Sequence, residues 1–191
     1  MKEAARDAEL VGGVLAGCRE DFAELVRRHH AAVLGLCASV LGDRTAADDA
    51  AQEVFLKAYG ALVDFRSDSA FTTWLHRIAV NHCLDLRRRR ARRAESSLDA
   101  LLEAEAPRVE ALLAGGSSRD PLEDADLAAR VLAALPEEYR LILTLREVQG
   151  LSYKELMGTL DCSMDAVKAR LRRARASLRE SLRHIMKPDN V

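Results

Sequence analysis

The sequence predicts an all-α protein made of two small helical domains joined by a flexible acidic linker. Ala, Leu and Arg dominate the 191 residues and aromatic residues make up only 4%, and both features favour helices. Apolar residues recur at spacings of three and four in two long segments. An acidic stretch with Pro107 and a Gly-Gly-Ser-Ser run separates them, which is typical of a linker. The predicted boundaries are residues 18–93, 94–120 and 121–187.

Three helices are predicted in the first domain. The first carries a continuous apolar stripe and ends at Gly42. Thr45 and Asp48 resemble a capping box that opens the second. The predicted helices cover residues 21–41, 46–62 and 70–92, with a polar loop at residues 65–69.

The second domain is predicted to contain four helices. Pro136 stops the first of them and Gly150 ends the second. Ser152 and Glu155 form a capping box at the start of the third, and Ser163 is the expected N-cap of the fourth. These helices are expected at residues 122–135, 137–149, 153–160 and 164–185.

Charge is segregated along the chain, although the net charge is only -1. Residues 77–93 carry seven Lys or Arg and one acid, and residues 166–187 carry eight and one. Residues 94–126 carry nine acids and two Arg. Any one of these runs alone would suggest a solvated face, but the basic, acidic, basic order favours a polyanionic partner for the two basic segments.

The sequence predicts neither a metal site nor a cofactor. The four cysteines are scattered without a CxxC pair, so disulfides are not expected, and Cys37 and Cys83 fall on apolar faces as buried thiols. His29 and His30 are expected on a helix surface. No apolar run could insert into a membrane and no signal peptide opens the chain, so we expect a cytoplasmic protein.

An aromatic group beside an arginine-rich helix makes residues 65–93 the most informative part of the sequence. Aromatic faces stack unpaired bases and arginines contact phosphates. The polar side chains of the loop, together with Asn81, could contact the edge of an extruded base. The alternative is that the aromatic residues form the core of a helical bundle. The predicted strand-binding residues are Phe65, Ser67, Asp68, Ser69, Phe71, Trp74, Asn81, Arg87, Arg88, Arg89 and Arg90.

The second predicted helix carries an acidic face with apolar members. Carboxylates repel phosphates, so this face favours a protein partner over DNA, the alternative being a solvated helix surface. Its members are Asp48, Asp49, Gln52, Glu53, Leu56 and Tyr59.

Residues 151–171 have the spacing of a helix-turn-helix, and a basic face runs along the last helix. A helix of this kind can place its first residues in a major groove, where Lys and Arg reach guanine edges or phosphates. The alternative is a basic amphipathic helix that stays solvated. The basic face contains Lys168, Arg172, Arg175 and Arg179.

Four segments, in this order and spacing, resemble the extracytoplasmic-function (group 4) sigma factors of bacterial RNA polymerase, of the sigma-70 family. DDAAQEVFLKAY is similar to the family's polymerase-clamp-binding helix, and FRSDSAFTTWLHRIAVNHCLD to its segment that reads and melts the -10 element. LPEEYRLILTLREVQGLSYKEL and DCSMDAVKARLRRAR are similar to its -35-binding domain. The recognition helix departs from the family pattern at Asp165 and Ala166, where Gly-Thr is usual.

The resemblance implies a transcription initiation factor rather than an enzyme. It implies binding to the β′ clamp and β subunits of core RNA polymerase, reading of -10 and -35 promoter DNA, and a role in a stress or envelope response. It also implies a monomer held by an anti-sigma factor, which can be membrane-bound. Arg77 joins the -10 residues by this resemblance, and the implied -35 residues are Arg146, Lys168, Ala169, Arg172, Arg173 and Arg175.

Other function classes fit less well. A ligand-sensing regulator that binds an operator as a dimer would have no use for a strand-capture loop. An enzyme would need a phosphate-binding Gly loop, a nucleophile with its base, or a set of metal ligands, and the sequence offers none of these. A scaffold or RNA-binding protein is not excluded by charge alone.

Overall fold

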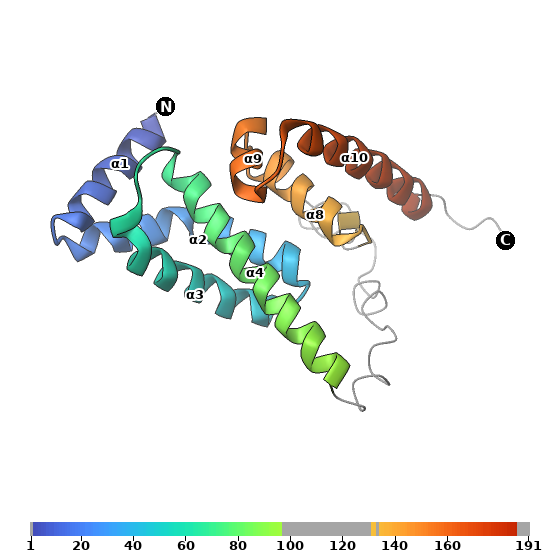
Figure 1. The fold of residues 1–191 in the computed structure, drawn as a ribbon, viewed down its shortest axis with the longest axis horizontal. Helices are drawn as coiled ribbons and strands as arrows, with labels where there is room; N and C mark the ends of the chain where they lie inside the picture. The colour runs from blue at the N-terminus through green and yellow to red at the C-terminus, as the bar shows by residue number, and fades with distance from the viewer. Residues whose placement is uncertain (1, 97–130, 133, 187–191) are drawn as a thin grey trace.

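The computed structural model describes residues 2–96, 131–132 and 134–186 (Figure 1). Within these ranges every regular element is helical and none is a strand. The all-α prediction is therefore confirmed. The elements are α1 (Lys2–Leu15), α2 (Arg19–Leu41), α3 (Arg44–Ala61), the short 3-10 helix η1 (Leu62–Asp64), α4 (Phe71–Ser96), α8 (Glu137–Leu143), the π-helical turn η2 (Thr144–Val148), α9 (Tyr153–Leu160) and α10 (Met164–Met186).

Helices α2, α3 and α4 pack on one another and form the core of the N-terminal module. Leu25, Leu36 and Leu75 are completely buried in it. Cys37 and Cys83 are also buried, as the sequence predicted, and a hydrogen bond with the Cys83 thiol together with burial raises the pKa of Cys37.

Two local expectations for this module need correction, and a third is confirmed. The N-cap of α3 is Asp43, whose carboxylate accepts from the backbone N–H groups of Thr45 and Ala46, so the helix begins before the Thr45 capping box that the sequence suggested. His29 is not a surface residue, since its side chain is only 12% exposed. Gly42 does end α2, with a φ of 67° that glycine adopts without strain.

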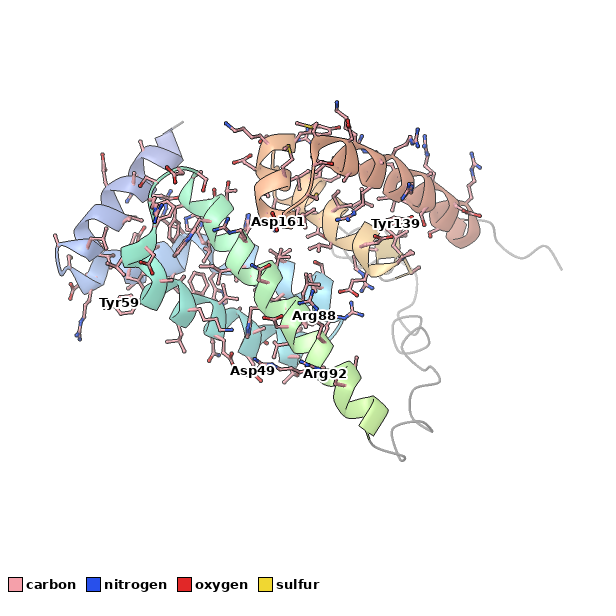
Figure 2. All side chains as sticks on the ribbon, in the orientation of Figure 1. Asp49, Tyr59, Arg88, Arg92, Tyr139 and Asp161 are labelled. Atoms are coloured by element: carbon pink, nitrogen blue, oxygen red, sulfur yellow. The ribbon has the colours of Figure 1, made fainter. Side chains whose placement is uncertain are left out.

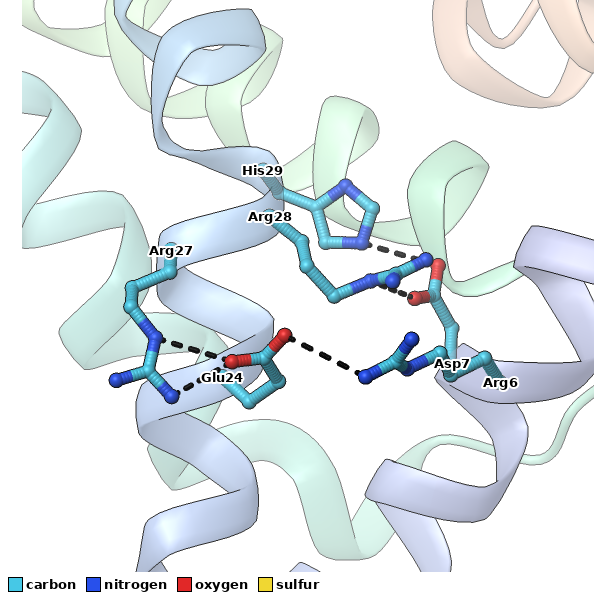
Figure 3. A network of polar contacts seen from close by, with 6 residues as sticks. All are labelled: Arg6, Asp7, Glu24, Arg27, Arg28 and His29. Atoms are coloured by element: carbon cyan, nitrogen blue, oxygen red, sulfur yellow. Dashed lines mark hydrogen bonds and ion pairs between the residues drawn. The ribbon is translucent and has the colours of Figure 1, made fainter.

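Helix α1 was not anticipated from the sequence, and a buried ionic cluster fastens it to α2 (Figure 3). Asp7 is 2% exposed. Its two carboxylate oxygens lie 3.0 Å from Arg28 Nε and 3.0 Å from His29 Nε2. Two partners offset the cost of burying this carboxylate, which is how a charge becomes acceptable inside a helical module.

The C-terminal module consists of α8, η2, α9 and α10, and local signals place its turns. The capping box of Ser152 and Glu155 is present, which confirms that prediction. Asp161 ends α9 in the left-handed conformation, and the Ser163 hydroxyl accepts from the N–H of Ala166 at the start of α10. Residues 97–120 of the predicted acidic linker, and residues 122–130 of the helix expected over residues 122–135, lie outside the described residues. Residues 94–96 belong to α4, which continues past the end predicted for this helix at residue 92.

The two modules are in contact, because α9 packs on α4 and α8 packs on α2. Thr73 Oγ1 donates to Glu155 Oε1 at 2.8 Å, and Gln149 Nε2 donates to the Ala32 carbonyl at 3.2 Å. Arg87 forms an ion pair with Glu137. The hydrophobic core continues from one module into the other.

Candidate polymerase and nucleic-acid interfaces

The aromatic residues predicted to bind an unpaired strand form one cluster at the start of α4. The ring centroids of Phe65 and Trp74 are 5.1 Å apart, those of Phe71 and Trp74 are 5.8 Å apart, and those of Phe65 and Phe71 are 6.0 Å apart. The cluster joins the loop that follows η1 to the first turn of α4.

Phe71 differs from its neighbours because it belongs to the core. It is 4% exposed and also contacts the His29 ring, with 5.5 Å between centroids. Phe65 and Trp74 are only half-buried. A direct stacking contact with a base is therefore open to Phe65 and Trp74, whereas Phe71 can only support them from beneath. The sequence did not separate these roles, because all three residues lie beside the same loop.

A pocket of about 540 Å³ opens beside the aromatic cluster. Ser67, at the turn of the loop above it, has a φ of 56°, a conformation that non-glycine residues seldom adopt. The predicted residues Phe65, Asp68, Ser69, Trp74 and Arg77 line the pocket, and Thr73, Lys154 and Glu155, which sequence reasoning missed, line it as well.

The carboxylate of Glu155 is held at the pocket wall by the N-terminal end of α9. Burial alone would raise the pKa of Glu155, but hydrogen bonds from Ser152 and Thr73 together lower the pKa below its ordinary value. The group is therefore an anion at neutral pH. Lys154 and Glu155 are on the C-terminal module, far from the loop in sequence, so no local pattern could have assigned them to this pocket.

The basic residues of α4 divide into paired and unpaired groups. Arg87 is held by Glu137 and Arg88 by Asp85. Arg89 and Arg90 are exposed, and no ion pair within the described ranges involves them. Both are therefore free to contact phosphates, whereas Arg87 must first exchange its partner.

Arg77 and Asn81 are exposed and line a second cleft, of about 640 Å³, between the two modules. Glu138, Asp161 and Arg170 line its other side. Two predicted strand-binding residues therefore face the C-terminal module in this arrangement.

All six residues of the predicted protein-binding face lie on α3 and are exposed. Asp49 and Tyr59 mark its two ends, on a side of the molecule away from α10 (Figure 2). Leu56 is 72% exposed, which is unusual for a large apolar side chain in a packed helix. Val63, in η1, is 75% exposed and extends this apolar surface beyond the residues that the sequence suggested.

The first half of α10 carries three exposed cations, Lys168 one turn before the neighbouring pair Arg172 and Arg173. Lys168, Arg172 and Arg173 are exposed, and none of the ion pairs among the described residues involves them. Ala169 lies next to this row and is half-buried. Val167, Leu171 and Ala174 on the opposite face are buried, so the helix presents its cations outward because its apolar stripe is packed inward.

Two further predicted DNA-binding residues have partners inside the module. Arg146 Nη1 donates to the Leu151 carbonyl at 2.6 Å, and its guanidinium lies 5.2 Å from the centroid of the Tyr153 ring. Arg175 donates two hydrogen bonds to Glu147, which raises its pKa further. Arg146 joins η2 to the segment that leads into α9, and Arg175 joins α10 to η2, so a role at DNA would be added to a structural one.

The described residues contain no cluster of three or more His, Cys, Asp or Glu side chains placed to hold a metal ion. In the same part of the chain, no helix is both long enough and apolar enough to span a bilayer.

Comparisons with known proteins agree on one family for both modules. Residues 25–93 match the model of Sigma-70 region 2, and residues 125–178 match that of Sigma-70, region 4. The RNA polymerase sigma-H factor of Pseudomonas aeruginosa is 36% identical, covering 95% of this chain and 96% of the relative. The ECF RNA polymerase sigma-E factor of Escherichia coli K12 is 38% identical, covering 93% and 95%.

Solved structures show the same fold. CnrH, in complex with the cytosolic domain of CnrY, has a TM-score of 0.68 and 27% identity, covering 94% of this chain and 98% of CnrH. The sigma factor RpoE of Bartonella quintana, in complex with the anti-sigma factor NepR, has a TM-score of 0.70 and 22% identity, covering 86% and 98%.

Proposed function

The chain belongs to the extracytoplasmic-function sigma factors of the sigma-70 family, and we propose that it uses three separate surfaces for polymerase and promoter DNA. As a sigma factor, it directs core RNA polymerase to initiate transcription at specific promoters. The assignment rests on one observation, which is that the three surfaces are separate from one another. An acidic and apolar helix face, an aromatic pocket and a row of unpaired cations occupy different elements.

The first surface is the exposed face of α3, which docks on the polymerase clamp. Leu56, Tyr59 and Val63 supply apolar contact area, and Asp49 and Glu53 supply charges for basic partner groups. Interfaces of this composition have an apolar centre and a polar rim. Asp48 and Gln52 lie on the same face and complete the rim.

The second surface is the pocket at residues 65–74, which receives a base displaced from the -10 element. Phe65 and Trp74 offer ring faces, and Asp68 and Ser69 offer hydrogen-bonding groups at the edge. An extruded base requires this combination of stacking and edge contacts. Arg77, Arg89 and Arg90 follow on α4 and contact the phosphates of the same strand.

The third surface is the first half of α10, which enters the major groove at the -35 element. Lys168, Arg172 and Arg173 are its base or phosphate contacts, and Ala169 permits close approach. Arg146 and Arg175 connect η2 to α9 and α10 and reach DNA only at its edge. We place region 2 at residues 18–93 and region 4 at residues 121–187, with residues 94–120 as the linker.

The arrangement of the two modules is closed with respect to DNA. Lys154 and Glu155 of α9 form part of the wall of the base pocket, so the C-terminal module borders the space that a displaced base would fill. Thr73, which would face the strand, is occupied by the Glu155 carboxylate. Promoter opening therefore requires α9 to leave α4, and binding to core polymerase supplies the competing contacts.

An anti-sigma factor, which can be membrane-bound, is the partner that we propose for the free chain in a stress or envelope response. The support is that CnrH, which is 27% identical, was solved in complex with the cytosolic domain of another protein. The sigma factor itself acts as a monomer in the cytoplasm, where polymerase and promoters are found.

Transcription with purified components tests the assignment. The full chain is added to core polymerase, and initiated transcripts are mapped across genomic DNA. We expect a limited set of start sites with shared -10 and -35 sequences, and no initiation without the chain. Tight binding of the isolated chain to a palindrome, without any effect on core polymerase, would overturn the proposal in favour of a dimeric operator-binding regulator.

A further inference from the structure

A buried histidine lies behind the proposed docking face of α3, and the function proposed above gives it no role. His82 belongs to α4, and its side chain is 3% exposed. Its ring contacts Glu53 and Lys57, two residues of α3 that are one helical turn apart and are both exposed.

The partners of the His82 ring determine where its proton is. Lys57 Nζ lies 2.5 Å from His82 Nδ1. An ammonium group can only donate, so Nδ1 is the acceptor and the ring proton is on Nε2. Burial lowers the pKa of His82, and Lys57 and Arg89 lower it further, against the opposite effect of Glu53 and Asp85. The ring is therefore neutral at pH 7.

The Nε2–H group of His82 faces the Glu53 carboxylate. Nε2 lies 3.4 Å from Glu53 Oε2 without the alignment of a hydrogen bond, and it has no other partner among the described residues. A buried donor that lacks a partner is costly, but this misaligned contact leaves the Glu53 side chain without a hydrogen bond from His82.

The position of Lys57 also affects whether it forms an ion pair with Glu53. Glu and Lys four residues apart on a helix usually attract each other at its surface. No ion pair joins Glu53 and Lys57 in the part of the chain that the structure describes, because the ammonium group of Lys57 is turned to His82 instead. The Glu53 carboxylate, on a side chain that is 58% exposed, is thereby left without a cation.

We infer that His82 is a positioning residue for polymerase docking, which holds Lys57 away from Glu53 and so keeps the Glu53 carboxylate available to a basic group of the polymerase. The inference rests on the docking role proposed for α3. It assigns His82 an effect through Lys57, which distinguishes it from a residue that only fills the core.

The test measures the affinity of the full chain for core RNA polymerase in His82→Leu, His82→Asn and Lys57→Met variants. His82→Leu has a similar volume but no acceptor, so Lys57 is released to pair with Glu53. We expect the affinity to fall roughly 1.4- to fivefold, the range of one exposed ion pair. His82→Asn keeps an acceptor near the Nδ1 position and should bind almost as tightly as the natural chain.

The deciding variant combines His82→Leu with Lys57→Met. Removing the ammonium group leaves nothing to neutralise Glu53, so the double variant should regain the affinity that His82→Leu lost. A loss that persists in the double variant, or one of equal size in His82→Asn, would mean that His82 serves only packing. If His82→Leu folds poorly, His82→Ala with and without Lys57→Met gives the same comparison.

The Glu53→Gln variant tests the docking role proposed for α3 separately from the inference about His82. If Glu53→Gln binds core polymerase as well as the natural chain does, the docking role of Glu53 is wrong and the inference falls with it. If Glu53→Gln weakens binding but His82→Leu does not, the docking role stands and only the inference about His82 is overturned.

Discussion

The N-terminal module builds its candidate DNA site from the edge of its core, whereas the C-terminal module places its site on side chains that stand clear of the core. Phe71 is 4% exposed and supports the rings of Phe65 and Trp74. Lys168, Arg172 and Arg173 on α10 are exposed and have no ion-pair partner within the described residues. Substitutions at the first site should therefore lower the stability of the fold, whereas substitutions at the second site should not.

The contrast fits the two tasks that we propose. A displaced base needs a cavity with apolar walls, and only a packed core can hold such walls in place. A recognition helix needs only a straight face of donors, which caps and an inward apolar stripe can provide locally. The two sites should consequently respond differently to the same kind of substitution.

The largest expected difference is in stability. Phe71→Ala removes a buried ring and should lower the free energy of unfolding by about 3–5 kcal/mol. Arg173→Ala, its counterpart on α10, should change the free energy of unfolding by no more than about 0.5 kcal/mol. Urea unfolding of both variants measures the difference. Similar small effects would show that the aromatic cluster is not part of the core, and the contrast would be lost.

Lowering the pH should reduce the stability of the N-terminal module in particular, since His76 is buried there. Burial and the nearby His29 lower the pKa of His76 from 6.5 to about 4. As pH falls from 7 to 4 the unfolded chain takes up a proton that the folded chain refuses, so stability falls, by roughly 3 kcal/mol. Urea unfolding at pH 7 and pH 4, compared with His76→Gln, isolates this loss. An unchanged pH dependence in the variant would contradict it.

Substitutions at the two sites should weaken binding to different parts of the promoter. Trp74→Ala removes a stacking face and should weaken binding of holoenzyme to single-stranded -10 DNA by about 1–3 kcal/mol. It should leave binding to duplex -35 DNA unchanged. Arg173→Ala should do the reverse, with a loss of about 1–3 kcal/mol on the duplex if it contacts a base edge. Filter binding with the two DNA probes measures both, and equal losses on both probes for both variants would remove the division of labour.

The smallest expected effect concerns the contact between the modules. Gln149→Ala removes the hydrogen bond to the Ala32 carbonyl, which is worth about 1 kcal/mol. The free chain should become more extended in X-ray scattering and should bind single-stranded -10 DNA more tightly. Val148→Ala, at an exposed neighbour, is the matched control. Unchanged scattering and affinity in Gln149→Ala would indicate that this bond does not hold the modules together.

Local signals in the sequence predicted much of the helical framework. The end of α2 at Gly42, the capping box of Ser152 and Glu155, and the Ser163 cap all depend on residues within a few positions of one another. The outward row of cations on α10 follows from helical spacing in the same way. The N-cap at Asp43 was missed because Thr45 offered a competing pattern two residues away.

Contacts between distant segments could not be predicted, because they depend on how whole helices pack. The burial of Phe71 depends on His29 of α2, and the pairing of Arg87 depends on Glu137 of the other module. The place of Glu155 in the base pocket depends on α9 reaching α4 across 82 positions of sequence.

The sequence by itself determined most of the described helices after α1, several of their caps, the segregation of charge and the family, since each depends on short-range spacing or on ordered motifs. The tertiary structure decided which aromatic rings remain accessible, which arginines are already paired, and that His82 stands between Lys57 and the Glu53 carboxylate. The physical reason is that accessibility and ion pairing depend on side chains from different helices, which come together only when the helices pack. The spacing of residues along one helix does not predict which side chains of another helix will lie beside it.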